Sequence, residues 1–229
     1  MTKIVERINV LDKGWIELQD IMGDDLSIVN AARTSYLGES KGDEQDKKLL
    51  FYLMKNGHTT PFEMVEFKFR VHCPIMVARQ WMRHRTWSYN EQSLRYTEAE
   101  SNEVYVPNEW RLQNSENKQG SGGTANEYDQ ELMTGMYEAF TIGAYQRYNL
   151  ALERGIAREQ ARLFLPGFAV YTTFVAKVDA HNLMHFLKLR MHEHAQYEIR
   201  VYAQAIYEHF FKLQLPWTAQ AFEEYMLHD

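Results

Sequence analysis

Two segments of alternating side chains, one at 66–73 and the other at 167–178, most constrain what this chain can fold into. An aromatic or β-branched residue occupies every second position in each, namely Phe67, Phe69 and Val71 in the first and Tyr171, Thr173 and Val175 in the second. A period of two predicts β-strands that turn one face toward a core. Two further strands are predicted at 3–10 and 15–21, parted by the turn residues Asp12-Lys13-Gly14.

Most of the remaining chain is predicted to be helical. We expect helices from Asp24 or Asp25, at 43–56 with Gly57 as the stop, from Pro74 to about Arg85, at about 127–154 with Gly155 as the stop, from the cap Asp179 onward, at about 195–213, and at 216–227. Thr60-Pro61-Phe62-Glu63 has the pattern of a capping box with proline at the first helical position. Few strands among long helices indicate a single α+β domain.

Two features lie around the longest predicted helix. The low-complexity segment 114–126 precedes it and is predicted to be a flexible surface loop rather than a domain linker. The helix itself carries Leu132, Met136 and Phe140 on one stripe. We expect its methionines and aromatic residues to pack in the core or at a subunit interface.

Charge and cysteine content narrow the function classes. The chain of 229 residues has 25 Lys and Arg against 31 Asp and Glu, a net charge of −6, which argues against a general nucleic-acid binder. Charged residues near the N-terminus exclude a secretory apolar region, and no apolar run reaches the roughly 18 residues of a membrane helix. The single cysteine, Cys73, excludes an intrachain disulfide and a cysteine zinc site. We therefore expect a cytoplasmic protein that binds neither nucleic acid nor membranes.

One basic segment stands out against this acidic background. Residues 70–95 contain five arginines and a single acid, Glu91. Charge runs usually mark a solvated helix face. A helix starting at Pro74, however, has two separate stripes. The stripe predicted to face the core has Ile75, Ala78 and Met82, and the polar stripe has Gln80, Arg83, His84 and Trp87. Short polar residues that end in Ser93 and Arg95 follow. Backbone amides, a hydroxyl and guanidinium groups indicate a site for a phosphorylated, planar ligand.

Short motifs along the chain give this segment a context. Arg83-His84-Arg85 is followed, after seven residues, by Ser93, with Gln80-Trp81 before and Arg95-Tyr96 after. Further matching blocks lie at 57–63, 161–166, 182–184 and 189–190. In this order and spacing, the set resembles the flavin-dependent thymidylate synthases.

The resemblance implies a reaction, cofactors and an assembly. Enzymes of this family methylate dUMP at C5 to give dTMP. Their carbon donor is 5,10-methylenetetrahydrofolate, and their hydride comes from FAD that NADPH has reduced. They have an antiparallel sheet flanked by long helices and form homotetramers whose active sites lie at subunit interfaces. We expect the same of this chain.

The resemblance also implies site residues. For FAD these are Ser35, Thr60, Arg83, His84, Arg85, Glu91, Asp179, His181 and His185. For dUMP they are Gln80, Arg83, Glu91, Gln92, Ser93, Leu94, Arg95, Arg162 and Arg190, of which Arg190 is the catalytic residue at the uracil edge. His58 either approaches the folate or nicotinamide side of the flavin or makes a hydrogen bond at a helix entry. No metal is expected.

The sequence departs from the family pattern at the start of one helix. Many members have Asn-x-Arg there and an Asn four residues after that Arg, whereas this chain has Asp179-Ala180-His181 and His185. An aspartate can still cap the helix, but an imidazole donates fewer hydrogen bonds than a guanidinium. We expect FAD still to bind, more weakly and with an affinity that depends on pH between about 5 and 8, where histidines titrate.

The residues themselves favour cofactor chemistry over a protein nucleophile. Cys73, between Val71 and Pro74, has a setting typical of a small buried hydrophobe. Ser93 has no histidine close in sequence to activate it, so we expect it to position a ligand. The remaining route is hydride transfer from a bound cofactor. Flavin fits it better than a Rossmann NAD site, because no G-x-G-x-x-G follows a strand.

Two other function classes are weaker alternatives. A metallohydrolase would use His181 and His185 with His192 and His194, but the His-Glu-x-x-His form is absent. An RNA-binding module would use the arginines with the stacking platforms Trp81, Trp87, Tyr89 and Tyr96. Flavin absorbance, a stoichiometric metal, or neither would distinguish the three classes.

Arg190 has two interpretations. In a helix from Asp179 it shares a face with Leu183, Phe186 and Leu187. A guanidinium on an apolar side is costly unless it reaches an acceptor. Arg190 therefore forms either a structural ion pair or a contact with the substrate, and the family match at 189–190 favours the substrate.

Overall fold

The two alternating segments form the centre of a β-sheet, but the second strand begins at Tyr171, later than predicted, because residues 167–169 form a turn before it. In the computed structural model, β3 (Glu66–Pro74) and β7 (Tyr171–Asp179) pair antiparallel, with Glu66 opposite Asp179 and Pro74 opposite Tyr171. One face of the pair is buried and consists of Phe67, Phe69, Val71, Cys73, Phe174, Ala176 and Val178. The opposite face carries His72 and Thr173, as the period of two requires. The structure describes residues 7–100, 103–115 and 120–227.

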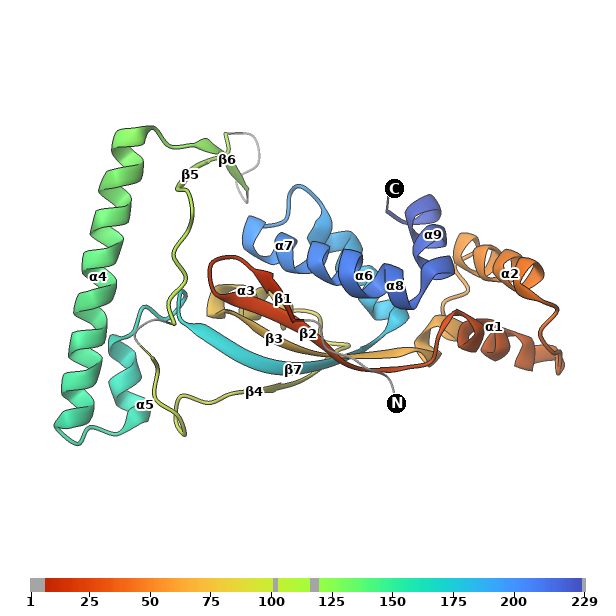
Figure 1. Ribbon diagram of the computed structural model, residues 1–229, viewed down its shortest axis with the longest axis horizontal. Helices are drawn as coiled ribbons and strands as arrows, with labels where there is room; N and C mark the ends of the chain where they lie inside the picture. The colour runs from red at the N-terminus through yellow and green to blue at the C-terminus, as the bar shows by residue number, and fades with distance from the viewer. Residues whose placement is uncertain (1–6, 101–102, 116–119, 228–229) are drawn as a thin grey trace.

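The remaining strands complete an antiparallel sheet of five in the order β1-β2-β3-β7-β4 (Figure 1). The edge strands are β1 (Arg7–Val10) and β4 (Ser88–Glu91), and β2 (Gly14–Met22) lies between β1 and β3. Residues 3–6 of the first predicted strand lie outside the described part. A separate pair is formed by β5 (Arg111–Gln113) and β6 (Ser121–Thr124). The predicted α+β class and the antiparallel sheet are confirmed.

Helices occupy most of the segments predicted for them. The α-helices are α1 (Asp25–Arg33), α2 (Asp43–Lys55), α3 (Ile75–Trp81), α4 (Glu127–Glu153), α5 (Arg158–Ala161), α6 (Ala180–Met191), α7 (Tyr197–Ile206), α8 (Lys212–Gln214) and α9 (Pro216–Tyr225). Shorter turns are the 3-10 helices η1 (Thr34–Tyr36), η2 (Thr60–Met64) and η3 (Arg162–Phe164) and the π-helix η4 (Tyr207–Phe211). Helices α3, α6 and α7 cover one face of the large sheet (Figure 1).

The predicted helix from Pro74 to about Arg85 ends earlier than expected, at Trp81. The hydroxyl of Tyr89 lies 3.0 Å from the carbonyl oxygens of both Trp81 and His84. It donates to carbonyl groups that the backbone amides of a further helical turn would otherwise have bonded. Trp87, which the prediction placed on the polar stripe, is 5% exposed and packs in the core against Phe186. Residues 83–85 therefore lie in a turn, where the side chains are not bound by helical periodicity.

Several predicted helix ends are confirmed and two local predictions are wrong. Asp24 and Asp179 cap α1 and α6 through their side chains, and Gly57 and Gly155 adopt positive φ after α2 and α4. The segment 60–63 forms no capping box, because Thr59 precedes η2 in helical geometry without a side-chain bond. The predicted loop 114–126 contains strand β6 and the Asn126 cap of α4, while residues 116–119 lie outside the described part.

Helix α4 stands apart from the sheet at one end of the molecule (Figure 1). Its buried residues, Ala144, Tyr145, Tyr148 and Ala151, all belong to its C-terminal half. Leu132, Met136 and Phe140 are exposed, and so are Tyr128, Ile142 and Leu150. Of the two predicted environments for this stripe, the core of the same chain is therefore wrong for Leu132, Met136 and Phe140.

Candidate active site

The turn at 83–86 and helix α6 enclose a cavity of about 520 Å³, which we call the arginine–histidine pocket. It is lined by Arg83, His84, Arg85, Thr86, His181, Asn182, His185, Leu189 and Arg190. The two segments are held together by ring packing, since Trp81, His84 and Trp87 all contact Phe186 of α6. None of the described lining residues is acidic, so the pocket favours an anionic ligand.

Arg190 is held in this pocket by a neutral histidine. Its Nε donates to His84 Nε2 over 3.0 Å, and its Nη2 donates to the carbonyl oxygen of Gln80 over 3.4 Å. Burial, followed by the positive charge of Arg190 and the nearby His185, lowers the pKa of His84 to about 4. A lone pair on His84 Nε2 is therefore available to the guanidinium at neutral pH. Within the described residues of this chain the acceptors that hold Arg190 are His84 and the Gln80 carbonyl, and none is a carboxylate.

We predict that His84 stays neutral throughout the range from about pH 5 to 8. In an NMR titration its imidazole should titrate near 4, and Arg190→Gln should move this pKa up toward the ordinary value of 6.5. Because the pKa is depressed in the folded state, His84 contributes stability above about pH 6.5 that is lost as pH falls toward 4. A native His84 pKa near 6.5 would contradict the geometry.

The residues that depart from the family pattern have distinct positions. Asp179 caps α6 by accepting from the amide of Asn182 over 2.9 Å and from its side-chain Nδ2 over 2.7 Å. Its carboxylate is therefore engaged at the helix start. His181 and His185 line the pocket one turn apart, and the ring of His185 meets that of His84 edge-on at 6.2 Å.

A second cavity of about 500 Å³, here called the serine pocket, lies on the other side of α3. Its lining comprises Ile75, Ala78, Arg79, Met82, Glu91, Gln92, Ser93, Leu94, Arg162, Tyr171 and Thr172. The stripe predicted to face the core, with Ile75, Ala78 and Met82, thus lines a cavity, while Val77, Ala78 and Trp81 are the buried residues of α3. The expected neighbours Glu91, Gln92, Ser93, Leu94 and Arg162 are brought together.

Arg79 and Thr172 are polar residues of the serine pocket that sequence reasoning missed, and Tyr171 is a third lining residue that it did not assign to the site. Arg79 is exposed and makes no ion pair among the described residues, so its guanidinium is available to a ligand. Thr172 is buried and donates to Glu91 Oε1 over 2.7 Å, which fixes the carboxylate at the pocket wall. Arg79 could have been found from its place beside Gln80 in the basic segment, but Thr172 gave no signal in the sequence.

Other predicted site residues lie outside both pockets of a single chain. Arg95 forms an ion pair with Glu159 at 3.4 Å, and Gln80 hydrogen-bonds to Gln196. Ser35 lies in η1 and Thr60 in η2, and neither lines a pocket described above. His58 meets the ring of Tyr52 edge-on at 5.8 Å, which differs from a hydrogen bond at a helix entry.

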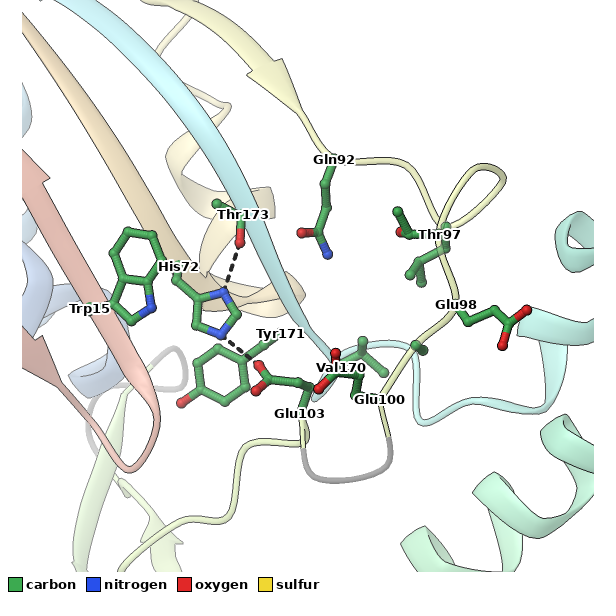
Figure 2. A pocket seen from close by; sticks show the side chains of 12 residues that line it. Trp15, His72, Gln92, Thr97, Glu98, Glu100, Glu103, Val170, Tyr171 and Thr173 are labelled. Carbon is green, nitrogen blue, oxygen red and sulfur yellow. Dashed lines mark hydrogen bonds and ion pairs between the residues drawn. The ribbon is translucent and has the colours of Figure 1, made fainter. Parts of the chain in front are cut away.

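A third cavity, of about 360 Å³, lies on the sheet face away from the helices (Figure 2). The ring of His72 stacks between Trp15 and Tyr171, and its two nitrogens lie 2.9 Å from Thr173 Oγ1 and 2.7 Å from Glu103 Oε2. Gln92 reaches this cavity as well as the serine pocket. Its walls also hold Glu98 and Glu100, so this cavity is less suited to a phosphate than the serine pocket.

The geometry weighs against both alternative classes. Trp81 and Trp87 are buried, so they offer no stacking surface to RNA. His192 and His194 follow the end of α6, and the described residues contain no group of three or more His, Cys, Asp or Glu arranged to hold a metal. Cys73 is fully buried, and burial raises the pKa of its thiol, which disfavours a nucleophilic thiolate.

Comparison with known proteins identifies the family. Residues 17–217 match the family described as "Thymidylate synthase complementing protein". The chain is 50% identical over 220 residues to a flavin-dependent thymidylate synthase of Thermus thermophilus, covering 96% of this chain and 79% of that relative. The chain belongs to the flavin-dependent thymidylate synthases.

Two further comparisons extend over nearly the full chain. The flavin-dependent thymidylate synthase of Thermosipho africanus is 47% identical over 213 residues, covering 93% of this chain and 92% of the relative. The structure resembles the UMP/dUMP methylase PolB from Streptomyces cacaoi, crystallised with 5-Br UMP, with a TM-score of 0.84 and 33% identity. That match covers 95% of this chain and 97% of PolB.

As a flavin-dependent thymidylate synthase, the chain is an enzyme that forms dTMP from dUMP. The resemblance stated from the motifs is therefore confirmed at the level of family and reaction. Among the helices that the structure describes, none has the length and hydrophobicity required to span a bilayer.

Proposed function

We propose that this flavin-dependent thymidylate synthase binds FAD at the arginine–histidine pocket and the phosphate of dUMP in the serine pocket. The carbon donor is 5,10-methylenetetrahydrofolate and the reductant is NADPH. The observation that carries the proposal is the exclusively neutral or cationic lining of the arginine–histidine pocket, with Arg190 fixed by neutral His84. The cytoplasmic location predicted from the sequence stays a prediction.

The arginine–histidine pocket has the chemistry to hold FAD. Arg83 and Arg85 present guanidinium donors that suit a pyrophosphate, and His181 and His185 add imidazole nitrogens from α6. When bound, the flavin supplies the hydride. The protein side chains bind and orient it, and Asp179 keeps the two histidines in place by capping their helix.

The serine pocket supplies donors for a phosphate. Arg79 and Arg162 enter it from α3 and η3, and Ser93 adds a hydroxyl. The Ser93 Oγ accepts from the amide of Arg95 over 3.3 Å, so its hydroxyl hydrogen remains free to donate. Glu91, held by Thr172, places an acceptor at the same wall for a sugar hydroxyl. A nucleoside monophosphate has both the phosphate that these donors would bind and the sugar hydroxyl that would donate to Glu91.

Arg190 is positioned to act on the pyrimidine. His84 occupies its Nε, while its Nη1 has no hydrogen-bond partner in the described part of the chain. A guanidinium fixed in this way can donate to a uracil carbonyl and stabilise negative charge that develops on the ring. That charge raises electron density at C5, where the new carbon is attached.

We propose that complete sites require more than one chain, as in a homotetramer. The two pockets share no lining residue, and Arg95 is turned toward Glu159. The exposed apolar side of α4, comprising Leu132, Met136 and Phe140, is a surface that a second copy would bury.

The proposal is tested by measuring dTMP formation from dUMP, 5,10-methylenetetrahydrofolate and NADPH. The purified enzyme should be active with FAD and inactive after FAD removal, and activity should return on adding FAD. Turnover that is independent of FAD, or that does not require the folate, would refute the assignment of these co-substrates.

Replacing Ser93 or Arg79 is predicted to weaken dUMP binding without abolishing turnover. Each loses a hydrogen bond to a charged group, worth about 1.5–3 kcal/mol, so Ser93→Ala and Arg79→Gln should raise the KM for dUMP by roughly 10- to 100-fold. Arg158→Gln is the control, because Arg158 pairs with Glu98 away from the pocket. A covalent nucleotide adduct trapped on Ser93 would overturn its positioning role.

A further inference from the structure

A separate aromatic groove lies where α2 packs against α9, and it shares no lining residue with either pocket. It has a volume of about 460 Å³ and is lined by Glu44, Lys47, Lys48, Phe51, Tyr52, Lys55 and Tyr225. We call it the lysine groove. Its walls are tied together, because Lys47 Nζ donates to Gln220 Oε1 over 2.6 Å and Asp25 accepts from the amides of Trp217 and Thr218.

The groove is positively charged within an acidic protein. Its one described carboxylate, that of Glu44, is already paired with Lys48 at 2.7 Å. Lys47 lies over the ring of Phe51 at 5.6 Å, and Lys55 lies over that of Tyr225 at 5.9 Å. Lys55 makes no ion pair in the described part of the chain. An aromatic floor below unneutralised ammonium groups favours a ligand that is both aromatic and anionic.

The spacing of the lysines distinguishes between kinds of anion. Lys47 and Lys55 are two turns apart on α2, so their Cα atoms are separated by about 12 Å at 1.5 Å per residue. A single phosphate needs donors that converge on it. Donors spread along a helix instead suit an extended series of negative charges.

The groove adjoins the proposed flavin side of the molecule. Tyr52, which lines it, contacts the ring of His58 at 5.8 Å. The chain then passes through η2 to Val65, whose carbonyl oxygen accepts from the amide of Ala180 over 2.8 Å. The next residue, His181, lines the arginine–histidine pocket. Tyr52 thus links the groove to His58, which the resemblance places at the folate or nicotinamide side of the flavin, and we infer that a folate bound beside His58 extends its other end toward the lysines.

We propose that the lysine groove binds the p-aminobenzoyl-glutamate tail of the folate co-substrate, with a preference for several γ-linked glutamates. The inference rests on the proposed function, which requires a folate. The p-aminobenzoyl ring lies against Phe51 and Tyr225, and successive carboxylates meet Lys47 and Lys55. The groove thereby selects polyglutamylated folate, while the chemistry takes place at the other end of the molecule.

Steady-state kinetics with two folates tests the proposal. The enzyme should have a lower KM for the triglutamate of 5,10-methylenetetrahydrofolate than for the monoglutamate. Replacing both Lys47 and Lys55 by alanine should raise the triglutamate KM roughly 5- to 20-fold, since each exposed ion pair is worth about a factor of 2 to 5. The kcat and the KM for dUMP should not change. Lys55→Glu should reverse the preference, and Lys68→Ala, an exposed lysine on β3, is the matched control.

A binding experiment separates this proposal from the proposed function. Calorimetry with p-aminobenzoyl-triglutamate, which lacks the pterin, should detect binding to the FAD-loaded enzyme that the double variant loses. Equal KM values for the two folates, or a rise in the KM for NADPH instead of folate, would overturn the proposal while leaving the synthase activity intact. Absence of turnover with both folates would count against the proposed function. In that case the calorimetric measurement with p-aminobenzoyl-triglutamate would still test the groove by itself.

Discussion

Arg190→Ala is expected to lower dTMP formation by roughly 10²- to 10³-fold or more, because a fixed donor to a developing negative charge commonly contributes that much. Binding of dUMP should weaken as well, and this is measured by calorimetry on the FAD-loaded enzyme. FAD content, followed by absorbance, should stay near that of the unaltered enzyme. The separation of these effects follows from the position of Arg190, which forms one wall of a pocket that other donors also line.

Two further variants make the Arg190 prediction specific. Arg190→Lys should restore little activity, since an ammonium group carries all its donors on one nitrogen and lacks the planar fork, whose separate nitrogens can bond His84 and a substrate carbonyl in different places. Lys188→Ala, two residues earlier on α6 and outside the pocket lining, should leave turnover unchanged. Near-normal turnover in Arg190→Ala would remove this residue from the mechanism.

The second large effect is expected at the surface of α4. A variant with both Met136→Glu and Phe140→Glu should fail to assemble and should lose most dTMP formation. If a second copy buries this side, each unpaired carboxylate there costs about 3–5 kcal/mol. Light scattering after size exclusion measures the assembly, and circular dichroism verifies that the helices remain.

The matched control is Asn149→Glu, which places the same charge on an exposed residue of the same helix outside that stripe. Asn149→Glu should leave mass and turnover unchanged. If the double variant retained the oligomeric mass and activity of the unaltered enzyme, α4 would not be the surface that joins the chains.

Local patterns predicted the backbone of this protein well. The alternation at 66–73 and 167–178 identified the central strands, and Asp24, Asp179, Gly57 and Gly155 marked helix ends, because each effect acts within a few residues. The early end of α3 was not predictable in this way. It depends on the Tyr89 hydroxyl and on Trp87 packing against Phe186 from α6, contacts that only the folded chain creates.

The candidate site was predicted unevenly for the same reason. The motif around Arg83, His84 and Arg85 indicated the ligand chemistry, and the structure places all three with Arg190 in one pocket. The bond from Arg190 to His84 joins residues 106 positions apart, and no sequence period reports it. The support of Glu91 by Thr172 likewise joins residues that meet only through the pairing of β4 with β7.

The pairing of β3 with β7 also sets when the arginine–histidine pocket can exist during synthesis of the chain. Its turn at 83–86 follows the first of these strands, whereas α6 begins only after the second. A nascent chain that has not yet emerged beyond Met191 therefore has arginines but no pocket wall opposite them. The two strands lie far apart in the sequence, and such non-local pairing forms slowly. FAD can therefore bind only late in the folding of each newly synthesised chain. Free FAD stabilises only chains in which α6 has already folded against the turn at 83–86.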